Sequence, residues 1–344
     1  GGNEFAVEHA DRIAREYLTA RQVHFRVLFR QIVFSLGLYA VGSATLLVAG
    51  GFLVIRGQLS LGQLVAAELI VAIILGSVTK MGKHLEGFYD LMASVDKLGA
   101  LFDLPLERQD GLLSLPGNGG VELKLRDVCY GYGEGQTVLE KVNLVVESGA
   151  SVGICGPSGC GKTTLAELLF GLRRATSGNI ELDGVDGDDL RPDVLRRHVS
   201  LVGPIEVIDG TITENVHLDR IKVDSTDVHE SLRRVGLLDT VFLLPRGLET
   251  HLTATGSPLS ETQVRRLMLA RAVAGNPRLL IIDTLLDAMP DDVAMHLMSV
   301  LSGEEASWTL IVFSGRRHIL ERCERIFNLV ESTSEPKSLR GERT

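Results

Sequence analysis

Cysteine and tryptophan are scarce in this sequence, which has four cysteines and one tryptophan. No two cysteines have the close spacing of a metal-binding pair, and Cys155 and Cys160 lie at one glycine-rich segment. The sequence therefore offers neither a disulfide framework nor a zinc site, and it suits a reducing cytosol. Positive charge is also in deficit, since the net charge is −9, which argues against nucleic acid as a partner.

No methionine begins the chain, and no signal or transit peptide is visible in its first residues. The 344 residues leave room for about two domains. We therefore expect the C-terminal part of a longer protein. Internal repeats are not visible, and the one biased stretch is a short polar tail over 332–344.

A glycine-rich segment has the pattern of a phosphate-binding loop: Gly156, four residues, then Gly161-Lys162-Thr163. Glycines let backbone N–H groups surround a phosphate, and a following helix directs the positive end of its dipole at it. Lys162 would reach the β- and γ-phosphates, and Thr163 would ligate Mg²⁺. A chance turn is the alternative, but an apolar strand precedes the loop and a helical pattern follows it. The segment predicts binding of a nucleoside triphosphate.

Two apolar runs occupy the N-terminal third. The first, from Gln31 to Ile55, carries no charge and is long enough to cross a bilayer as a helix. Its glycines and other small residues indicate close packing against another helix. Arginines before the first run and lysines after the second place both ends in the cytoplasm by the positive-inside rule. Two buried helices of a soluble protein are the alternative.

Glu68 interrupts the second apolar run, which begins at Leu61. A carboxylate in hydrocarbon costs about 2.5–3.5 kcal/mol on insertion scales, so it should face another helix or a wet cavity. At about 1.5 Å per residue it sits roughly 10 Å into the run. Contact with a transported substrate and a hydrogen bond between helices both fit this position.

These patterns predict an all-α membrane segment followed by an α/β nucleotide-binding domain. Strands are expected near 121–130, 138–146, 150–155, 179–183, 198–202, 279–283 and 309–313, with helices between them. The expected layout is a cytosolic helix over 1–30, membrane helices over about 31–55 and 61–79, a cytosolic extension over 80–104, a linker over 105–120, an ATP-binding domain over 121–331 and the tail over 332–344.

With a membrane hairpin ahead of the phosphate loop, and Leu259-Ser260-Glu261-Thr262-Gln263 after it, the chain resembles an ABC transporter of the exporter type. In that family six membrane helices precede a cytosolic ATP-binding domain, and two such halves make the transporter. The resemblance covers the last two membrane helices and one whole α/β P-loop domain. It implies half of an ATP-driven exporter with MgATP as cofactor, in which residues 1–30 include the coupling helix.

The resemblance also assigns residues. Tyr132 corresponds to the aromatic residue that stacks on adenine, although an ordinary strand-end tyrosine is the alternative. Asp283, at the end of an apolar strand, corresponds to the acid that organises Mg²⁺ together with Thr163. Residues 259–263 correspond to the signature that contacts ATP across the dimer. The expected ATP-binding residues are Tyr132, Gly156, Pro157, Ser158, Gly159, Cys160, Gly161, Lys162, Thr163 and Thr164.

The departures from the family pattern fall on the groups that hydrolyse ATP. Thr284 stands where the family has a glutamate base, and losing such a base costs about 10²–10⁴ in rate. Gly315 stands where it has the switch histidine, and the glutamine expected after Leu201-Val202 is absent. In the signature, Glu261 and Thr262 replace two glycines. At about 6 Å and an effective dielectric near 20, the added charge would repel a phosphate by roughly 3 kcal/mol.

We therefore expect ATP binding to survive and hydrolysis at this site to be weak, with no intact catalytic residue of the family set. The favoured function is one half of an exporter whose turnover depends on a second, better-equipped half, so that a heterodimer is favoured over a homodimer. A regulatory half that binds ATP without turnover is the alternative, and a soluble kinase is disfavoured by the hairpin. A third possibility is a competent ATPase in which Asp287 or Glu206 replaces the base.

The expected location is a multi-pass protein of a bacterial plasma membrane, in contact with lipid, with the ATP-binding domain in the cytoplasm. The sequence does not identify the transported substrate.

Overall fold

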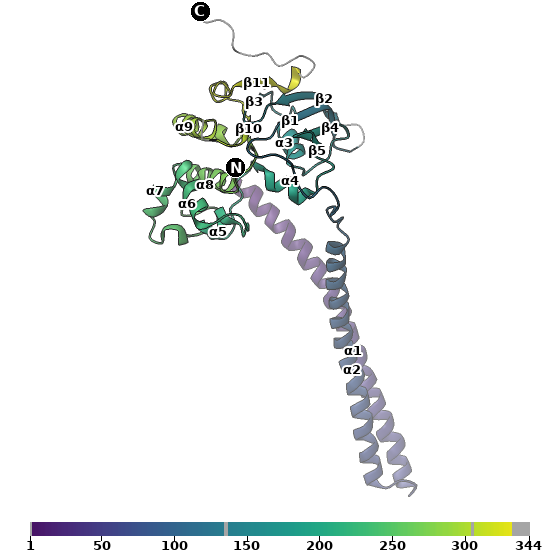
Figure 1. The fold of residues 1–344 in the computed structure, drawn as a ribbon. Helices are drawn as coiled ribbons and strands as arrows, with labels where there is room; N and C mark the ends of the chain where they lie inside the picture. The colour runs from purple at the N-terminus through teal and green to yellow at the C-terminus, as the bar shows by residue number, and fades with distance from the viewer. Residues whose placement is uncertain (1, 134–136, 304–305, 332–344) are drawn as a thin grey trace, which may run out of the picture. The chain divides into compact units, whose positions relative to one another are not determined.

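The computed structural model describes residues 2–133, 137–303 and 306–331. The chain divides into two units, Gly1–Leu106 and Glu107–Thr344 (Figure 1). The first is helical, and the second is an α/β unit. This confirms the predicted fold class of a helical segment followed by an α/β nucleotide-binding domain.

The described part of the helical unit consists of α1 (Gly2–Ile55) and α2 (Leu61–Phe102), joined by a short polar turn. The turn ends at Ser60, whose hydroxyl accepts a hydrogen bond from the Gln63 N–H while the Gln63 side chain accepts one from the Ser60 N–H. This capping box begins α2 where the sequence changes from polar to apolar. The polar stretch over 1–30 and the apolar stretch over 31–55 were expected as two helices; from Gly2 onward they form one continuous helix.

Small residues bring the two helices close together. An added Cβ at Gly50 would lie 2.2 Å from Leu64 Cδ1, and one at Gly42 would lie 3.2 Å from Leu75 Cδ1. Between these positions Ser43 Oγ donates to a carboxylate oxygen of Glu68. The structure thus contains the interhelical hydrogen bond that was one of the two interpretations of Glu68, and a contact with substrate stays a prediction.

Among the described residues, one helix has the length and apolar composition of a membrane span: Val7–Ile55, within α1. The apolar stretch of α2, Leu61–Ser77, is shorter. Large apolar side chains on both helices are exposed, including Val48 at 75% and Ile73 at 69%. The helical unit does not cover this apolar surface by itself.

The α/β unit is built around a parallel sheet of five strands, counted over the described residues, in the order β11-β3-β10-β9-β6. A second, antiparallel sheet has the order β2-β1-β4-β5, and β7 pairs with β8. All seven predicted strands are present, whereas β5, β7, β8 and β11 were not predicted. The strands are β1 (Leu123–Gly131), β2 (Thr137–Val146), β3 (Ser151–Cys155), β4 (Ser177–Leu182), β5 (Val185–Asp186), β6 (Val199–Val202), β7 (Gly210–Thr211), β8 (His251–Leu252), β9 (Leu279–Asp283), β10 (Thr309–Phe313) and β11 (Arg325–Asn328).

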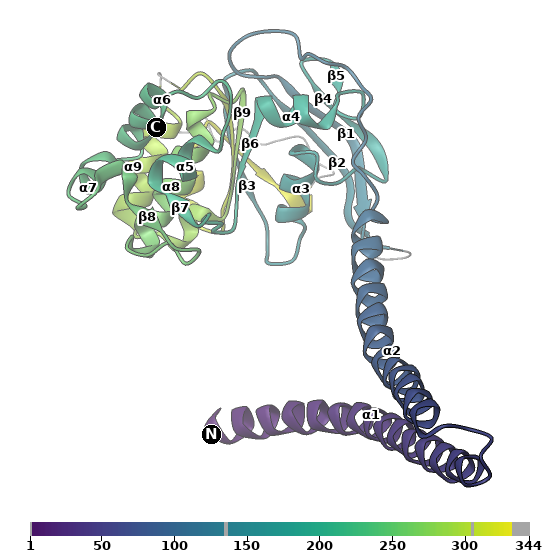
Figure 2. The ribbon, with the colours of Figure 1, turned by 90° about the horizontal axis from the view of Figure 1, so that it is seen from below.

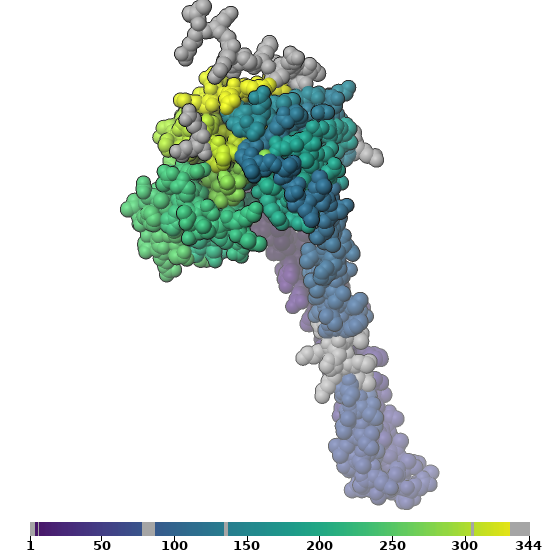
Figure 3. Space-filling model, viewed as in Figure 1, coloured from purple at the N-terminus to yellow at the C-terminus, as the bar shows by residue number. Residues whose placement is uncertain are grey.

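Helices cover both faces of the parallel sheet. In Figure 2, β3, β6 and β9 stand between α3 and α4 on one side and the group from α5 to α9 on the other. The space-filling view shows residues of α5 to α7, in green, as a lobe that projects from the unit (Figure 3). The helices are α3 (Lys162–Leu169), α4 (Pro192–His198), α5 (Ile212–His217), α6 (Ser225–Arg234), α7 (Leu238–Phe242), α8 (Glu261–Ala274), α9 (Asp291–Leu301) and α10 (Arg317–Leu320), with 3₁₀ turns η1 (Gly247–Glu249), η2 (Leu285–Ala288) and η3 (Leu329–Glu331).

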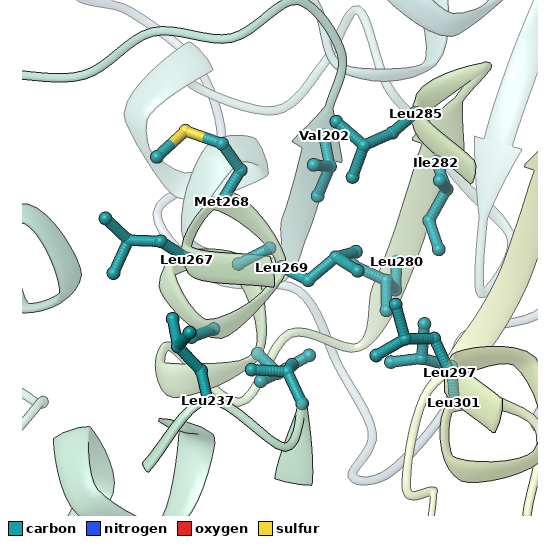
Figure 4. Close-up of a cluster of buried hydrophobic side chains, with 14 of the residues drawn as sticks. Val202, Leu237, Leu267, Met268, Leu269, Leu280, Ile282, Leu285, Leu297 and Leu301 are labelled. Atoms are coloured by element: carbon teal, nitrogen blue, oxygen red, sulfur yellow. The ribbon is translucent and has the colours of Figure 1, made fainter. Parts of the chain in front are cut away.

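The central strands are apolar on both faces, as a covered parallel sheet requires. Along β9, Leu280 and Ile282 point into one core cluster, while Leu279 and Ile281 point into the other. Figure 4 shows the first cluster, where these strand residues meet leucines of α8 and α9. This alternation follows from the two-residue period of a strand, and it determines which face of the sheet each β9 side chain occupies.

Most of the predicted linker over 105–120 packs on the α/β unit, which begins at Glu107. Arg278, 8% exposed, holds this segment: Nε donates to the Gly119 carbonyl at 2.8 Å, and one terminal nitrogen donates to the Pro116 carbonyl at 2.6 Å. The other terminal nitrogen forms an ion pair with Asp183. One guanidinium therefore ties the entry segment to β9 and to the end of β4.

We expect Arg278→Ala to destabilise the α/β unit by about 3 kcal/mol, because removing one partner of a buried ion pair leaves the other unpaired. Trp308 is the single tryptophan and is 2% exposed, so its fluorescence reports unfolding of this unit in urea titrations of the full chain. Arg278→Lys should lose less stability than Arg278→Ala, because lysine keeps a positive charge beside Asp183. An unchanged urea midpoint of unfolding in Arg278→Ala would show that the contacts of Arg278 contribute nothing to the stability of this unit.

Candidate functional site

The register of the parallel sheet places several loops at one edge. Phe313 at the end of β10 pairs with Ile154 of β3 and with Asp283 at the end of β9. The segments that follow these three residues therefore leave the sheet at the same level. They are the phosphate loop, the segment from Thr284 onward and the segment from Ser314 onward.

The phosphate loop lies between β3 and α3 and depends on glycine. Gly159 and Gly161 have φ of +82° and +96°, a region that favours glycine. An added Cβ at Gly161 would lie 2.6 Å from Leu139 Cδ2, inside the packed core. Because Gly161 directly precedes α3, the unpaired N–H groups of the first helical turn adjoin the loop. This is the arrangement expected for binding an anion.

Lys162 lies against the loop itself. Its Nζ donates to the Gly156 carbonyl at 2.7 Å and to the Pro157 carbonyl at 2.9 Å. The ammonium is thus held beside the same backbone whose N–H groups would surround a phosphate. The structure brings Lys162 together with Gly156 and Pro157, and their role in binding phosphate stays a prediction.

Asp283 has the surroundings of a metal ligand. The residue is 6% exposed, and among the described residues its Oδ1 is buried with no hydrogen-bond partner. Burial raises the pKa of Asp283, and a hydrogen bond with Thr163 opposes that rise. A buried carboxylate oxygen without a partner, next to a hydroxyl at the phosphate loop, suits a hard divalent cation such as Mg²⁺. Thr163 and Asp283 would hold this ion, which would neutralise phosphate charge there.

A single cleft contains the loop, the predicted adenine-stacking residue and the positions of the expected catalytic groups. It is lined by Tyr132, Val138, Gly156, Ser158, Gly159, Gly161, Lys162, Thr163, Thr164, Thr284, Asp287 and Gly315. Three distant parts of the chain therefore meet at one site. The geometry of the cleft is consistent with binding of a nucleotide. The roles of the individual lining residues are proposals.

Tyr132 is anchored at the rim of this cleft. Its hydroxyl shares a hydrogen bond with Thr164 Oγ1 at 3.1 Å, and the Arg173 guanidinium lies 4.7 Å from its ring centroid. The Tyr130 ring meets it edge-on, with 5.2 Å between the centroids. The Tyr132 side chain is thus fixed relative to the phosphate loop and remains 43% exposed. Stacking on adenine stays a prediction.

Thr284 is strained. It has φ of +55°, which is unfavourable for a β-branched residue, and its N–H donates to the Phe313 carbonyl at 3.0 Å. Its side chain is exposed to the cleft. A hydroxyl with an ordinary pKa is a poor base, and Gly315, across the cleft, has no side chain at all.

Asp287, one of the two acids considered as a substitute for the base, lies at this cleft. It lies in η2 and lines the cleft, and it accepts hydrogen bonds from Ser314 Oγ at 2.5 Å and from the Gly315 N–H at 2.8 Å. Glu206, the other substitute considered, is exposed, and its backbone carbonyl accepts a hydrogen bond from Arg271. The sequence signal for Asp287 was an acid at an unexpected position shortly after Asp283.

The signature segment begins α8, away from the elements that line the cleft. Ser260 caps this helix, with its Oγ accepting from the Gln263 N–H at 3.4 Å. A hydroxyl that accepts still has its own hydrogen to donate. Glu261 forms an ion pair with Arg265 at 2.5 Å, although Glu261 is 72% exposed. This pairing offsets part of the repulsion toward phosphate that the sequence suggested.

Comparisons with known proteins identify relatives of this chain. The family model described as ABC transporter matches residues 139–286, from β2 to η2. The chain is 30% identical over 279 residues to the alpha-hemolysin translocation ATP-binding protein HlyB of Escherichia coli O157:H7, covering 80% of this chain and 39% of that protein. It is 30% identical over 277 residues to an ATP-dependent lipid A-core flippase of Methylococcus capsulatus, covering 79% of this chain and 46% of the flippase.

A third relative is the uncharacterised ABC transporter ATP-binding protein YwjA of Bacillus subtilis, 28% identical over 81% of this chain and 49% of the relative. The chain thus spans less than half the length of these curated relatives. Among solved structures, a bacterial Atm1-family ABC exporter with ATP bound matches with a TM-score of 0.73 and 22% identity, over 86% of this chain and 53% of that one. This likeness extends the shared fold across both units.

The phosphate loop, the parallel sheet that carries it and the helical segment ahead of it therefore agree with the family match and the relatives. The chain belongs to the ABC transporters and has the layout of the exporter type, with a helical membrane-domain segment fused to an ATP-binding domain.

Proposed function

We propose that this chain is part of one half of an ATP-driven exporter, in which MgATP bound in the cleft closes two ATP-binding domains and thereby moves the membrane helices. The observation that carries the proposal is the convergence of Lys162, Thr163 and Asp283 at one edge of the parallel sheet. The relatives named for translocation of alpha-hemolysin and for flipping lipid A-core support export as the direction. Their substrates are not transferred to this chain.

The site needs a second half. In the family the signature of one half meets the phosphate loop of the other, so residues 259–263 would act on a partner's ATP. A heterodimer is favoured, because a partner with an intact base and switch histidine would supply the turnover that this half lacks. The exposed apolar surfaces of α1 and α2 would contact lipid and membrane helices in a multi-pass protein of a bacterial plasma membrane. The ATP-binding domain would lie in the cytoplasm.

Hydrolysis at this chain's own site should be slow. Thr284 and Gly315 line the cleft at the positions where the family has its base and its switch histidine. The same observation favours a second candidate, a regulatory half that binds ATP and gates its partner without turnover. Turnover of bound ATP separates the two, since the regulatory half would release ATP intact both alone and with a partner.

Lys162→Ala should weaken MgATP binding by the full chain about 10- to 100-fold, which corresponds to one lost hydrogen bond to a charged group. Equilibrium dialysis with radiolabelled ATP measures the affinity directly. Lys124→Ala is the matched control, because Lys124 pairs with Glu122 on the antiparallel sheet. Equal affinity of the wild-type chain and Lys162→Ala would contradict binding at this loop.

Glu261→Gln should favour ATP-induced closure of two copies of the chain, by at most about 100-fold in the closure equilibrium, because it removes a negative charge near the partner's phosphates. Distances between spin labels on two copies at saturating MgATP report the closed fraction. Glu230→Gln, which removes an acid paired with Arg234 on α6, is the control. If both variants close as the wild type does, Glu261 does not face phosphate.

A further inference from the structure

Asp287 is an acid at the nucleotide cleft, in the segment 287–290 that stands where the family pattern has Ser-Ala-Leu-Asp, so an acid replaces the serine. Its carboxylate is bound on one side by two consecutive residues of the segment after β10: Ser314 Oγ donates at 2.5 Å and the Gly315 N–H at 2.8 Å. One bond reaches each carboxylate oxygen, so the orientation of the group is fixed. The side chain is half-buried and belongs to the lining of the cleft.

This carboxylate retains the capacity to accept further hydrogen bonds. An ionised carboxylate has about four lone-pair positions, and the bonds from Ser314 and Gly315 use two of them. A water molecule in the cleft could therefore donate to Asp287 without displacing either partner. Thr284, in contrast, offers the cleft only a hydroxyl.

Gly315 places no side chain beside Asp287. An added Cβ at Gly315 would lie 3.6 Å from Asp287 Oδ2, which is ordinary van der Waals contact. A larger side chain at this position, such as the histidine of the family, would extend from that point next to the carboxylate. The two departures are thus complementary, because the acid lies beside the position where a side chain is missing.

We propose that Asp287 is the catalytic base of this cleft, accepting a hydrogen bond and then a proton from the water that attacks the terminal phosphorus of ATP. The proposal rests on the proposed function, since it requires ATP in the cleft. In the step, the water oxygen forms a new bond to phosphorus, and the bond to the bridging oxygen of ADP breaks, with its electron pair leaving on ADP. The water proton passes to Asp287 and then to solvent, which regenerates the carboxylate.

Two features distinguish Asp287 from the base of the family. Asp287 is one of the groups that raise the pKa of Asp283, after burial as the main cause. The two acids are thus close enough to repel, and ATP would bring more negative charge to the same cleft. Asp287 lies three residues after Thr284, the position of the family's base, and would therefore approach the water from a different direction.

The test is single-turnover hydrolysis of ATP labelled at the γ-phosphate by the full chain in lipid nanodiscs, with the MgATP dissociation constant measured on the same samples. Asp287→Asn should lower the rate by about 10²-fold or more, to the level of Lys162→Ala. Its MgATP affinity should stay within about 2-fold of the wild type, because the amide oxygen still accepts from the segment after β10. Thr284→Glu added to Asp287→Asn should restore turnover by supplying a carboxylate at the family position.

Two further variants separate catalysis from loop anchoring. Ser314→Ala removes one hydrogen bond to Asp287 and keeps the carboxylate, so turnover should fall only a few-fold. Asp291→Asn removes a neighbouring acid that pairs with Arg316, and turnover should stay within about 2-fold.

The outcomes distinguish this inference from the proposed function. If the wild-type chain does not bind MgATP, the proposed function fails. If it binds MgATP but turns over no faster than Lys162→Ala, the function stands in its regulatory form and the assignment of Asp287 is overturned. Equal losses in Asp287→Asn and Ser314→Ala, with weaker binding in both, would show that Asp287 only anchors the segment after β10.

Discussion

Parallel pairing of β3, β10 and β9 is the constraint on which the site depends. The register aligns Ile154, Phe313 and Asp283 across the three strands. Because parallel strands end at the same edge, a loop, an acid and a switch segment from widely separated parts of the chain meet there. The register also fixes which side chains enter each core: Leu280 and Ile282 pack into one cluster and Leu279 and Ile281 into the other, and a shift by one residue would interchange the two sets.

The substitutions that we expect to slow hydrolysis leave this framework intact, because they lie just beyond the strand ends. Thr284 carries a left-handed conformation that costs on the order of 1–3 kcal/mol. It is held between buried residues, Asp283 before it and Leu285 and Leu286 after it. The packing of these buried neighbours can therefore compensate the backbone strain at Thr284. The groups expected to hold MgATP come from the phosphate loop and from Asp283 at the end of β9, while the groups expected to split it follow β9 and β10, so the two sets can change separately.

Much of the fold was predictable because its signals are local. The glycines and Lys162 of the phosphate loop, the apolar strands and the turn before α2 all follow from spacing and residue type. Four short strands were not predicted, since two-residue strands such as β5 have no periodicity to detect. The packing of the segment before β1 depends on Arg278, which lies far along the chain. The sequence offered Asp287 only as one of two possible substitutes for the base, and its hydrogen bonds to Ser314 and Gly315 could not be predicted, because they join segments far apart in the chain.

The central claim is that this cleft holds MgATP firmly and cleaves it slowly. The most direct measurement follows a single load of labelled ATP on the full chain and compares the rate of its release with the rate of its conversion to ADP. We predict that most of the ATP leaves intact, with ADP forming in a small fraction of binding events. Prompt conversion of most bound ATP before release would contradict the account.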